Sequence, residues 1–343
     1  MRRLWICLIG AGLLIAGAIL FLFSGRKRET VPQVVLTYAE NQTQEYPTTQ
    51  GAYYFADLLK ERTGGRVQVL VYPQAVLGDE ISTVKELSWD GIDMVRCSLY
   101  TLEDYNPETV VLMLPYLYDS SESMWKVLDG EIGRKIMDSF SGTGMAALSW
   151  YDAGVRSFYF RDPLSGMEDL QGRLIRVQQS GIMEDMVKAL GATPVPMNYE
   201  DVYAGLQQGS VDGAENNWNS YAAMEHYQVA PYFWEDAHVR IPELQMISEA
   251  ALSELSAQDQ KTLRACAAQS AVYERKKWKE QEERAKQEAL AGGCTVIPFS
   301  DSDREKMREA MEPLYEKYGS DYQDLIRRIQ AEQEQSGAVT ADK

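Results

Sequence analysis

Two arginines lie within short apolar runs that are typical of β-strands. Arg156 lies near the start of the run 155–160, and Arg176 lies inside the run 174–177. A guanidinium in such a run is costly to bury unless an anionic group faces it. That group could be one of the 51 acidic residues of the chain. It could equally be a ligand carboxylate, which the planar guanidinium binds bidentately, and spacing alone leaves both interpretations open.

A cluster of polar side chains ends the segment GSVDGAENNWNSY, residues 209–221. Gly209 is expected to end a helix whose N-cap is Asn198, and a short strand then follows. Glu215 and Asn216 lie at the carboxyl end of that strand, where open α/β sheets bind their ligands. Asn216 offers a donor and an acceptor to a ligand, although an amide at this place can also cap a loop.

Three glutamates suggest two kinds of chemistry. Glu80, Glu215 and Glu243 are candidates for the carboxylate pair of a glycosidase, or for acceptors of sugar hydroxyl groups. Because acidic residues are so numerous, the glycosidase pattern is a weak signal.

Other side chains are assigned structural roles. Trp218 and Tyr151 could stack on a sugar ring, but a core position is favoured in a chain with 20 Tyr and 7 Trp. His226 and His238 are the only histidines, and we interpret them as surface or helix-end residues.

Composition narrows the class of protein. The chain has 343 residues, enough for two α/β domains, and its formal net charge is −17. Such a charge argues against nucleic acid as a partner, and an acidic ligand would need a local cationic pocket. The four cysteines have no CxxC spacing, and no phosphate-binding glycine motif occurs. We therefore expect no metal and no cofactor.

The order of predicted elements favours mostly parallel sheets with crossover helices. Apolar runs at 34–38, 66–72 and 92–99 alternate with helical patterns, and further strands are expected at 145–150, 155–160 and 174–177. After Pro242, residues 252–290 favour one or two long helices, followed by helices at 303–318 and 322–330. The tail 336–343 is expected to be disordered.

The N-terminal segment, residues 1–28, contains an apolar run at 4–23 that is flanked by basic residues. At about 1.5 Å per residue such a run can cross the ~30 Å hydrocarbon layer of a membrane. Because no small-residue cleavage site follows the run, we favour an uncleaved membrane anchor over a cleaved secretion signal.

The chain as a whole resembles the solute-binding subunit of a TRAP (tripartite ATP-independent periplasmic) transporter of the DctP family. The resemblance covers residues 34–330. It rests on the motifs RTGGRVQVLVYP (62–73), LG (77–78), GIDM (91–94), LPYLY (114–118), GVRSF (154–158), GRLIRV (172–177) and GSVDGAENN (209–217).

This resemblance implies an α/β, two-lobed periplasmic-binding-protein-like fold with a long helix spanning both lobes. Lobe I would comprise residues 34–153 and 242–281, and lobe II residues 154–241 and 282–335. An organic acid would bind in the interlobe cleft without catalysis. The location would be extracytoplasmic, and the partners would be the membrane permease subunits of the transporter.

The resemblance also assigns roles to residues of the cleft. Arg176 stands at the position of the carboxylate-clamping arginine, Arg156 at that of a second cleft arginine, and Asn216 at that of the cleft amide. The hydroxyl groups of the ligand would contact a further set of polar residues: Asn41, Glu80, Gln178, Glu215 and Glu243.

The ligand that the resemblance favours is a sugar acid. The runs RVQQS (176–180), GAENNW (213–218) and PEL (242–244) are similar to members that bind hexuronates such as glucuronate or galacturonate. Asn219 stands where many such members have proline, and Glu40-Asn41 stands where histidine is common. A C4-dicarboxylate or another hydroxy acid is the alternative ligand, and a glycosidase acting on uronic-acid polymers is the alternative class.

Overall fold

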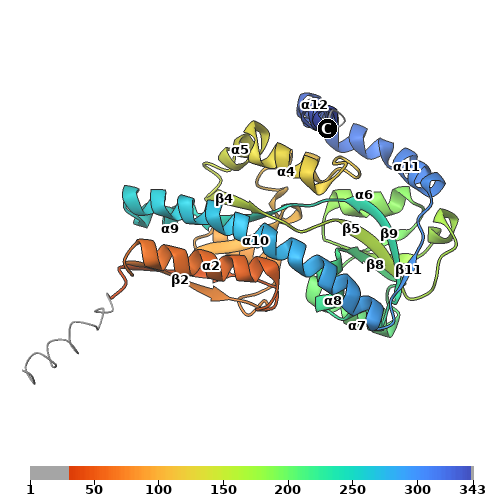
Figure 1. The fold of residues 1–343 in the computed structure, drawn as a ribbon, viewed down its shortest axis with the longest axis horizontal. Coiled ribbons are helices and arrows are strands. Elements are labelled where there is room, and N and C mark those ends of the chain that lie inside the picture. The colour runs from red at the N-terminus through yellow and green to blue at the C-terminus, as the bar shows by residue number, and fades with distance from the viewer. Residues whose placement is uncertain (1–30, 341–343) are drawn as a thin grey trace, which may run out of the picture.

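Two twisted β-sheets lie next to each other along the long axis of the molecule, and one long helix crosses both (Figure 1). The structure is a computed structural model and describes residues 31–340. The first sheet has the strand order β2-β1-β3-β10-β4, and the second has the order β11-β9-β5-β8-β6-β7. The α/β fold with a long helix that was expected is confirmed, whereas the sheets are mixed rather than mostly parallel.

The first sheet combines parallel and antiparallel pairing. Strands β1, β2 and β3 are parallel, whereas β10 pairs antiparallel with both β3 and β4. The strands span β1 (Val34–Ala39), β2 (Val67–Tyr72), β3 (Met94–Ser98), β4 (Met145–Tyr151) and β10 (Glu243–Ser248). The helices of this part of the chain are α2 (Pro47–Arg62), α3 (Glu80–Ser88), α4 (Ser121–Asp129), α5 (Glu131–Asp138) and α9 (Glu249–Glu254), with 3-10 turns at η1 (Leu99–Leu102) and η2 (Pro107–Met113).

The second sheet places strand β5 at its centre, antiparallel to both β8 and β9. Its strands span β5 (Arg156–Phe160), β6 (Leu174–Val177), β7 (Thr193–Pro196), β8 (Gly213–Asn216), β9 (Tyr232–Val239) and β11 (Thr295–Ile297). The remaining helices are α6 (Gly181–Ala189), α7 (Val202–Gln208), α8 (Trp218–Ala223), α11 (Asp301–Gly319) and α12 (Gln323–Thr340), with 3-10 turns at η3 (Met167–Leu170), η4 (Tyr199–Asp201), η5 (His226–Gln228) and η6 (Ser320–Tyr322).

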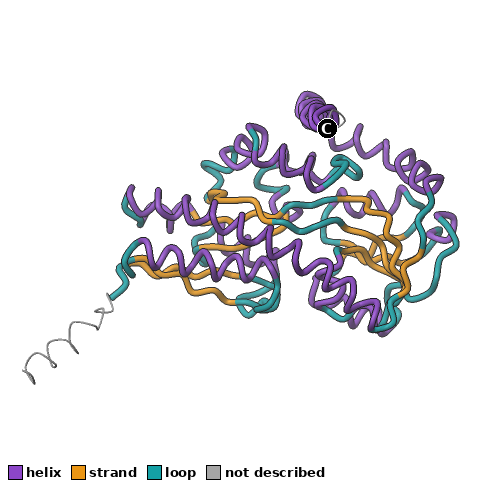
Figure 2. The backbone as a smooth tube through the Cα atoms, viewed as in Figure 1, coloured by secondary structure: helices purple, strands orange, loops and turns teal. Residues whose placement is uncertain are grey.

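The long helix α10 (Ala257–Ala291) explains the sparse apolar pattern of residues 252–290. Its first half packs on α2, and its second half packs on α8 (Figures 1 and 2). Leu263 and Ala267 join the core beneath the first sheet, whereas Ala285 and Ala289 join a core beneath the second. Each half therefore needs only a narrow apolar stripe, and the rest of the helix surface is polar.

The chain also links the two sheets through residues 152–155, between β4 and β5, and residues 240–242, between β9 and β10. The division into lobe I and lobe II at the predicted residues stays a prediction. Helix α12 was expected to belong to lobe II, but it packs on α4, and the Gln333 side chain donates to the Leu117 carbonyl. Helix α12 thus returns the chain to the side of the first sheet, whereas α11 packs on α6 beside the second.

Three local expectations differ from the structure. Asn198 does not cap a helix, because the 3-10 turn η4 intervenes before α7 and its side chain accepts instead from Gln179 Nε2 at 2.5 Å. Helix α12 continues to Thr340, so part of the tail predicted to be disordered is helical. The predicted anchor lies outside the described residues, and within 31–340 no helix is both long and apolar enough to cross a bilayer.

Replacement of Gly154 by alanine tests how closely α10 packs on the link between β4 and β5. The φ of Gly154 is +63°, and an added Cβ would lie 2.9 Å from Trp278 Nε1 on α10. Gly172 has φ +77° with nothing within 4 Å of such a Cβ, so Gly172→Ala measures the backbone strain alone. We expect Gly172→Ala to lower the unfolding free energy by about 1 kcal/mol. Gly154→Ala should cost about 1–3 kcal/mol more because it also overpacks the link. Urea denaturation measures both, and equal losses would show that α10 does not press on this link.

Candidate ligand-binding site

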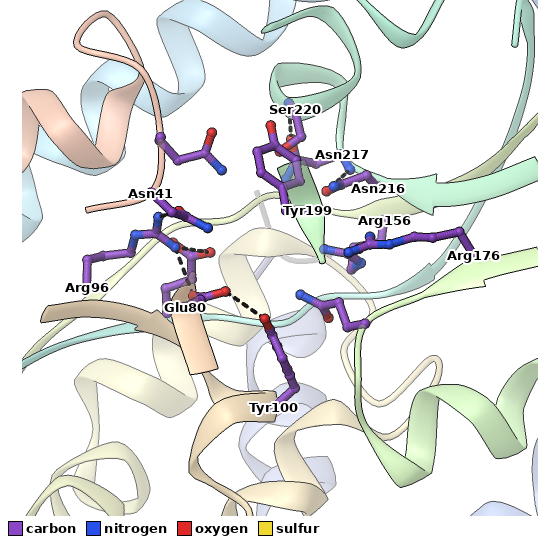
Figure 3. Close-up of a pocket in the computed structure, with 13 residues that line it drawn as sticks. Asn41, Glu80, Arg96, Tyr100, Arg156, Arg176, Tyr199, Asn216, Asn217 and Ser220 are labelled. Atoms are coloured by element: carbon purple, nitrogen blue, oxygen red, sulfur yellow. Dashed lines mark hydrogen bonds and ion pairs between the residues drawn. The ribbon is translucent and has the colours of Figure 1, made fainter. Parts of the chain in front are cut away.

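A polar cavity lies between the two sheets, at the ends of strands from both (Figure 3). It has about 360 Å³ of empty volume, part of which is open to solvent. The side of the first sheet contributes Asn41, Gln42, Glu80, Arg96, Tyr100 and Glu243, and the side of the second contributes Arg156, Arg176, Gln178, Tyr199, Asn216, Asn217 and Ser220.

Arg176 is the arginine of this cavity that has no ion pair among the described residues. It lies on β6, between β7 and β8, and is 2% exposed. Its Nε and Nη2 atoms donate to the Met197 carbonyl at 3.0 and 2.7 Å, and within residues 31–340 it forms no ion pair with a carboxylate. Burial lowers the pKa of Arg176, and the neighbouring Arg156 lowers it further. The guanidinium therefore lacks the anion that a buried positive charge requires.

Arg156 lies beside Arg176 but already has an anion (Figure 3). Its Nε and Nη2 atoms donate to the two carboxylate oxygens of Glu215 at 2.5 and 2.8 Å. Glu215 is fully buried on β8 and does not line the cavity, so the expected direct contact with a ligand is corrected. Its role is to hold Arg156 in place from behind.

His238 extends this row of charges away from the cavity. Its Nδ1 atom lies 2.6 Å from Asp236 Oδ2, and its Nε2 atom lies 3.5 Å from Glu215 Oε2. Burial alone would lower the pKa of His238, but Asp236 and Glu215 raise it to about 9. Burial alone would likewise raise the pKa of Glu215, but Arg156 and His238 hold it at about 2. The row Arg156, Glu215, His238 and Asp236 is thus internally neutral.

Both histidines are buried, so neither is a surface residue; His226 does begin the 3-10 turn η5, whereas His238 lies in strand β9 and not at a helix end. Strand β9, which carries His238, is covered by β5 on one edge and β11 on the other. His226 shares a 2.8 Å hydrogen bond between Nδ1 and the Tyr159 hydroxyl, and burial lowers its pKa to about 3. His226 is therefore a neutral core residue.

The amides at the end of β8 have two different roles. Asn217 caps α8 by accepting from the Ser220 amide at 2.7 Å, and it donates to the Ala153 carbonyl at 3.0 Å. Asn216 accepts from the Asn217 amide at 2.9 Å and lines the cavity. Asn219 is fully buried in α8 and is not part of the wall.

Several polar atoms of the cavity wall are buried without a hydrogen-bond partner within the described residues. They are Gln178 Oε1, the Tyr199 hydroxyl and Glu243 Oε2. Because buried polar atoms are nearly always paired in proteins, these three atoms require donors and acceptors from whatever fills the cavity. A ligand rich in hydroxyl groups can supply both.

Sequence reasoning missed Arg96, the third buried arginine of the site. It lies on β3 and contacts Glu40, Asn41, Glu80 and Glu243. Arg96 interrupts the apolar run of β3 as Arg176 interrupts β6, so the same argument about a buried charge could have found it.

Seven of the eight predicted ligand-binding residues line one cavity, and only Glu215 does not. The other wall residues missed, besides Arg96, are Gln42, Tyr100, Tyr199, Asn217 and Ser220. Trp218 stacks on Phe233 with 3.7 Å between ring centroids, and Tyr151 is fully buried, so both have the core positions that were favoured.

The cavity lies between two sheets that one helix crosses, and one of its walls has an excess of positive charge. These features are those of a binding protein for a small organic acid. Residues 38–321 match the DctP family, described as bacterial extracellular solute-binding protein, family 7. The chain belongs to this family of extracytoplasmic solute-binding proteins, which are not enzymes.

Relatives and solved structures agree with this assignment. A solute-binding protein of Chromohalobacter salexigens is 31% identical over 281 residues, covering 82% of this chain and 83% of the relative. A TRAP periplasmic solute-binding protein of Xanthobacter autotrophicus with bound β-D-galacturonate has a TM-score of 0.84 and 34% identity, covering 86% of this chain and 99% of that one. A protein of the same class from Pseudomonas putida with bound D-glucuronate has a TM-score of 0.84 and 29% identity, covering 87% and 97%.

The charge row behind Arg156 predicts a specific pH dependence of stability. The folded-state pKa of His238, about 9, lies above the ordinary value of about 6.5. The stabilisation that the ion pairs of His238 provide is therefore fully present below pH ~6.5 and is lost as the pH rises through 9. We expect the difference in unfolding free energy between wild type and His238→Gln to shrink by up to about 3 kcal/mol between pH 6.5 and 9.

His226→Gln is the matched control for this measurement. The pKa of His226 is about 3 in the folded protein and about 6.5 in the unfolded chain. Protonation of His226 therefore changes the stability only below pH ~6.5. The difference between wild type and His226→Gln should therefore stay constant from pH 6.5 to 9. Urea denaturation across this range measures both differences, and a constant difference for His238→Gln would refute the ion-pair row.

Proposed function

We propose that this protein captures a hexuronate, such as glucuronate or galacturonate, and delivers it to the membrane permease subunits of a TRAP transporter. The observation that carries the proposal is Arg176, a buried guanidinium in a cavity wall with no acidic partner among the described residues. The similar proteins with bound galacturonate and glucuronate support it.

The ligand carboxylate would lie against Arg176 and Arg156. It would supply the missing negative charge through charge-assisted hydrogen bonds, which the guanidinium plane favours. Asn216 and the three unpartnered polar atoms, of Gln178, Tyr199 and Glu243, would then bind hydroxyl groups of the sugar. Closure of the two lobes would exclude water from these contacts and strengthen each of them.

The two alternatives have less support. Relatives named as C4-dicarboxylate-binding proteins occur in Bacillus subtilis and Rhodobacter capsulatus, at 25% and 26% identity. A glycosidase would need Glu215 at its substrate, but this carboxylate is buried behind the cavity and held by Arg156.

Removal of the proposed clamp tests the function. Arg176→Ala should weaken binding of glucuronate and galacturonate by about 2–5 kcal/mol, because a buried carboxylate would lose its cation. Arg173→Ala is the control, since Arg173 is a partly exposed arginine just before β6 that contacts Asp162 and the Asp169 carbonyl. Isothermal titration calorimetry measures both variants, and unchanged affinity in Arg176→Ala would exclude the clamp.

A thermal-shift screen of wild type with uronates, aldonates and dicarboxylates tests the ligand class, and no stabilisation by a uronate would exclude a hexuronate.

We further propose that residues 1–28 tether the protein to the outer face of the cell membrane. The support is the apolar run 4–23, which is long enough to span a bilayer. The full chain should pellet with membranes and resist extraction by salt, whereas a chain exported by a cleavable signal in place of residues 1–28 should stay soluble. Recovery of the full chain in the soluble fraction without its first residues would show a cleaved signal instead.

A further inference from the structure

We propose that the wall formed by Arg96, Glu40, Glu80 and Glu243, here called the Arg96 cluster, holds one proton among its carboxyl groups and accepts only an uncharged, hydroxylated end of the ligand. The cluster would thereby reject any ligand with a second carboxylate. This inference rests on the proposed function, because it assigns the specificity of the same cavity.

The cluster places three carboxyl groups around a single guanidinium. Arg96 Nε donates to both carboxylate oxygens of Glu40, at 3.0 and 3.1 Å. Arg96 Nη1 lies 3.1 Å from Glu80 Oε1 and 3.2 Å from Glu243 Oε1. Arg96 and Glu40 are each 2% exposed. Three ionised carboxylates would leave an excess of two negative charges away from water, which is a costly arrangement.

Hydrogen bonding shows which of the three carboxyl groups holds the proton. Glu80 accepts from the Ser98 amide at 2.6 Å and from the Tyr100 hydroxyl at 2.9 Å, and Glu40 accepts from the Gln42 amide at 3.0 Å. These donors stabilise the ionised forms. Among residues 31–340 the Glu243 carboxyl group contacts only Arg96, and its Oε2 atom is buried with no partner from that part of the chain. Glu243 is therefore the carboxyl group that stays protonated.

The charged and titratable groups that face Glu243 come from several elements: Arg96, Glu40, Glu80, Arg156, Glu274 and Tyr46. Burial raises the pKa of Glu243 to about 8 against the opposing effect of Arg96, and the neighbouring Glu80 and Glu40 raise it further. The proton is thus retained at neutral pH and is lost in mildly alkaline solution.

The two walls of the cavity then have opposite charge. Arg156 and Arg176 face one carboxylate, Glu215, so this wall has an excess positive charge. The Arg96 cluster keeps an excess negative charge even with Glu243 protonated. A hexuronate, with one carboxylate and otherwise hydroxyl groups, matches both walls. An aldarate of the same carbon skeleton has carboxylates at both ends and would place one of them against Glu40 and Glu80, where like charges repel.

Galacturonate and galactarate, which differ in the charge at one end, test the proposal on the unmodified full chain. Because galactarate is also open-chain, galactonate, an open-chain acid with a single carboxylate, is the control for loss of the ring and should bind more tightly than galactarate. At pH 7, calorimetry should show galactarate, with both carboxylates ionised, binding at least a hundredfold more weakly than galacturonate. Glu80→Gln removes one negative charge and keeps an acceptor for the Ser98 amide, so it should reduce this ratio at least tenfold. Equal affinity of wild type for the two ligands, within threefold, would overturn the proposal.

The proton is tested by the pH dependence of galacturonate binding. Wild-type affinity should be constant from pH 6 to 7.5 and then fall by up to tenfold per pH unit above 8. Glu243→Gln has no proton to lose at this position, so its affinity, whatever its value at pH 7, should lose most of this decline. The same decline in Glu243→Gln as in wild type would overturn the assignment of the proton.

The outcomes separate this inference from the proposed function. If wild type binds neither galacturonate nor glucuronate, the proposed function fails. If it binds galacturonate and galactarate equally well, only the role of the Arg96 cluster fails. The comparison of the two ligands needs no variant, so it remains decisive even if Glu80→Gln or Glu243→Gln does not fold.

Discussion

The burial of a positive charge without an internal anion is the constraint on which the site depends. Arg176 is held on β6, between β7 and β8, by two hydrogen bonds to the Met197 carbonyl, and it is 2% exposed. Arg156 beside it is neutralised by Glu215, and Glu215 and Asp236 together balance His238 and Arg156. The positive charge left over corresponds to a single carboxylate. The residues of this wall thus carry an excess of one positive charge.

A protein with a net charge of −17 can bind an acid only if the attraction is local. The cavity provides a local attraction because its positive and negative groups lie on opposite walls. Guanidinium groups of the second sheet form one wall, and an excess of carboxyl groups from the first sheet forms the other. The fold thereby makes a site that distinguishes the two ends of its ligand, which bulk charge cannot do.

The geometry of this site depends on the helix that spans both sheets. Helix α10 packs so closely on the chain at Gly51 that an added Cβ would lie 2.9 Å from Glu274 Cβ, and it meets Gly154 in the link between β4 and β5. Trp278, midway along the helix, packs with Tyr46 and Ala153 at the junction. The helix therefore supports the cavity from behind, where the two walls meet.

Part of the site could be read from the sequence because the reason is local. Arg156 and Arg176 lie in apolar strands, and a buried charge demands a partner whatever the fold, so their functional interest is visible in a few neighbouring residues. Asn216 was found because polar residues at a strand end mark ligand sites in α/β sheets. Arg96 carried the same signal in β3 and could have been found by the same argument.

Only the tertiary structure decided which partner each charge has. Glu215 reaches Arg156 because β5 and β8 are neighbours, and His238 reaches Glu215 because β9 flanks β5 on the other side. Glu243 meets Arg96 because β10 returns to the first sheet beside β3 after the chain has built the second. These residues are far apart in the sequence, and strand order is set by the packing of the whole chain. The sequence by itself thus determined the class of protein and the charges that needed partners, whereas the order of the strands decided which charges are paired and which remain for a ligand.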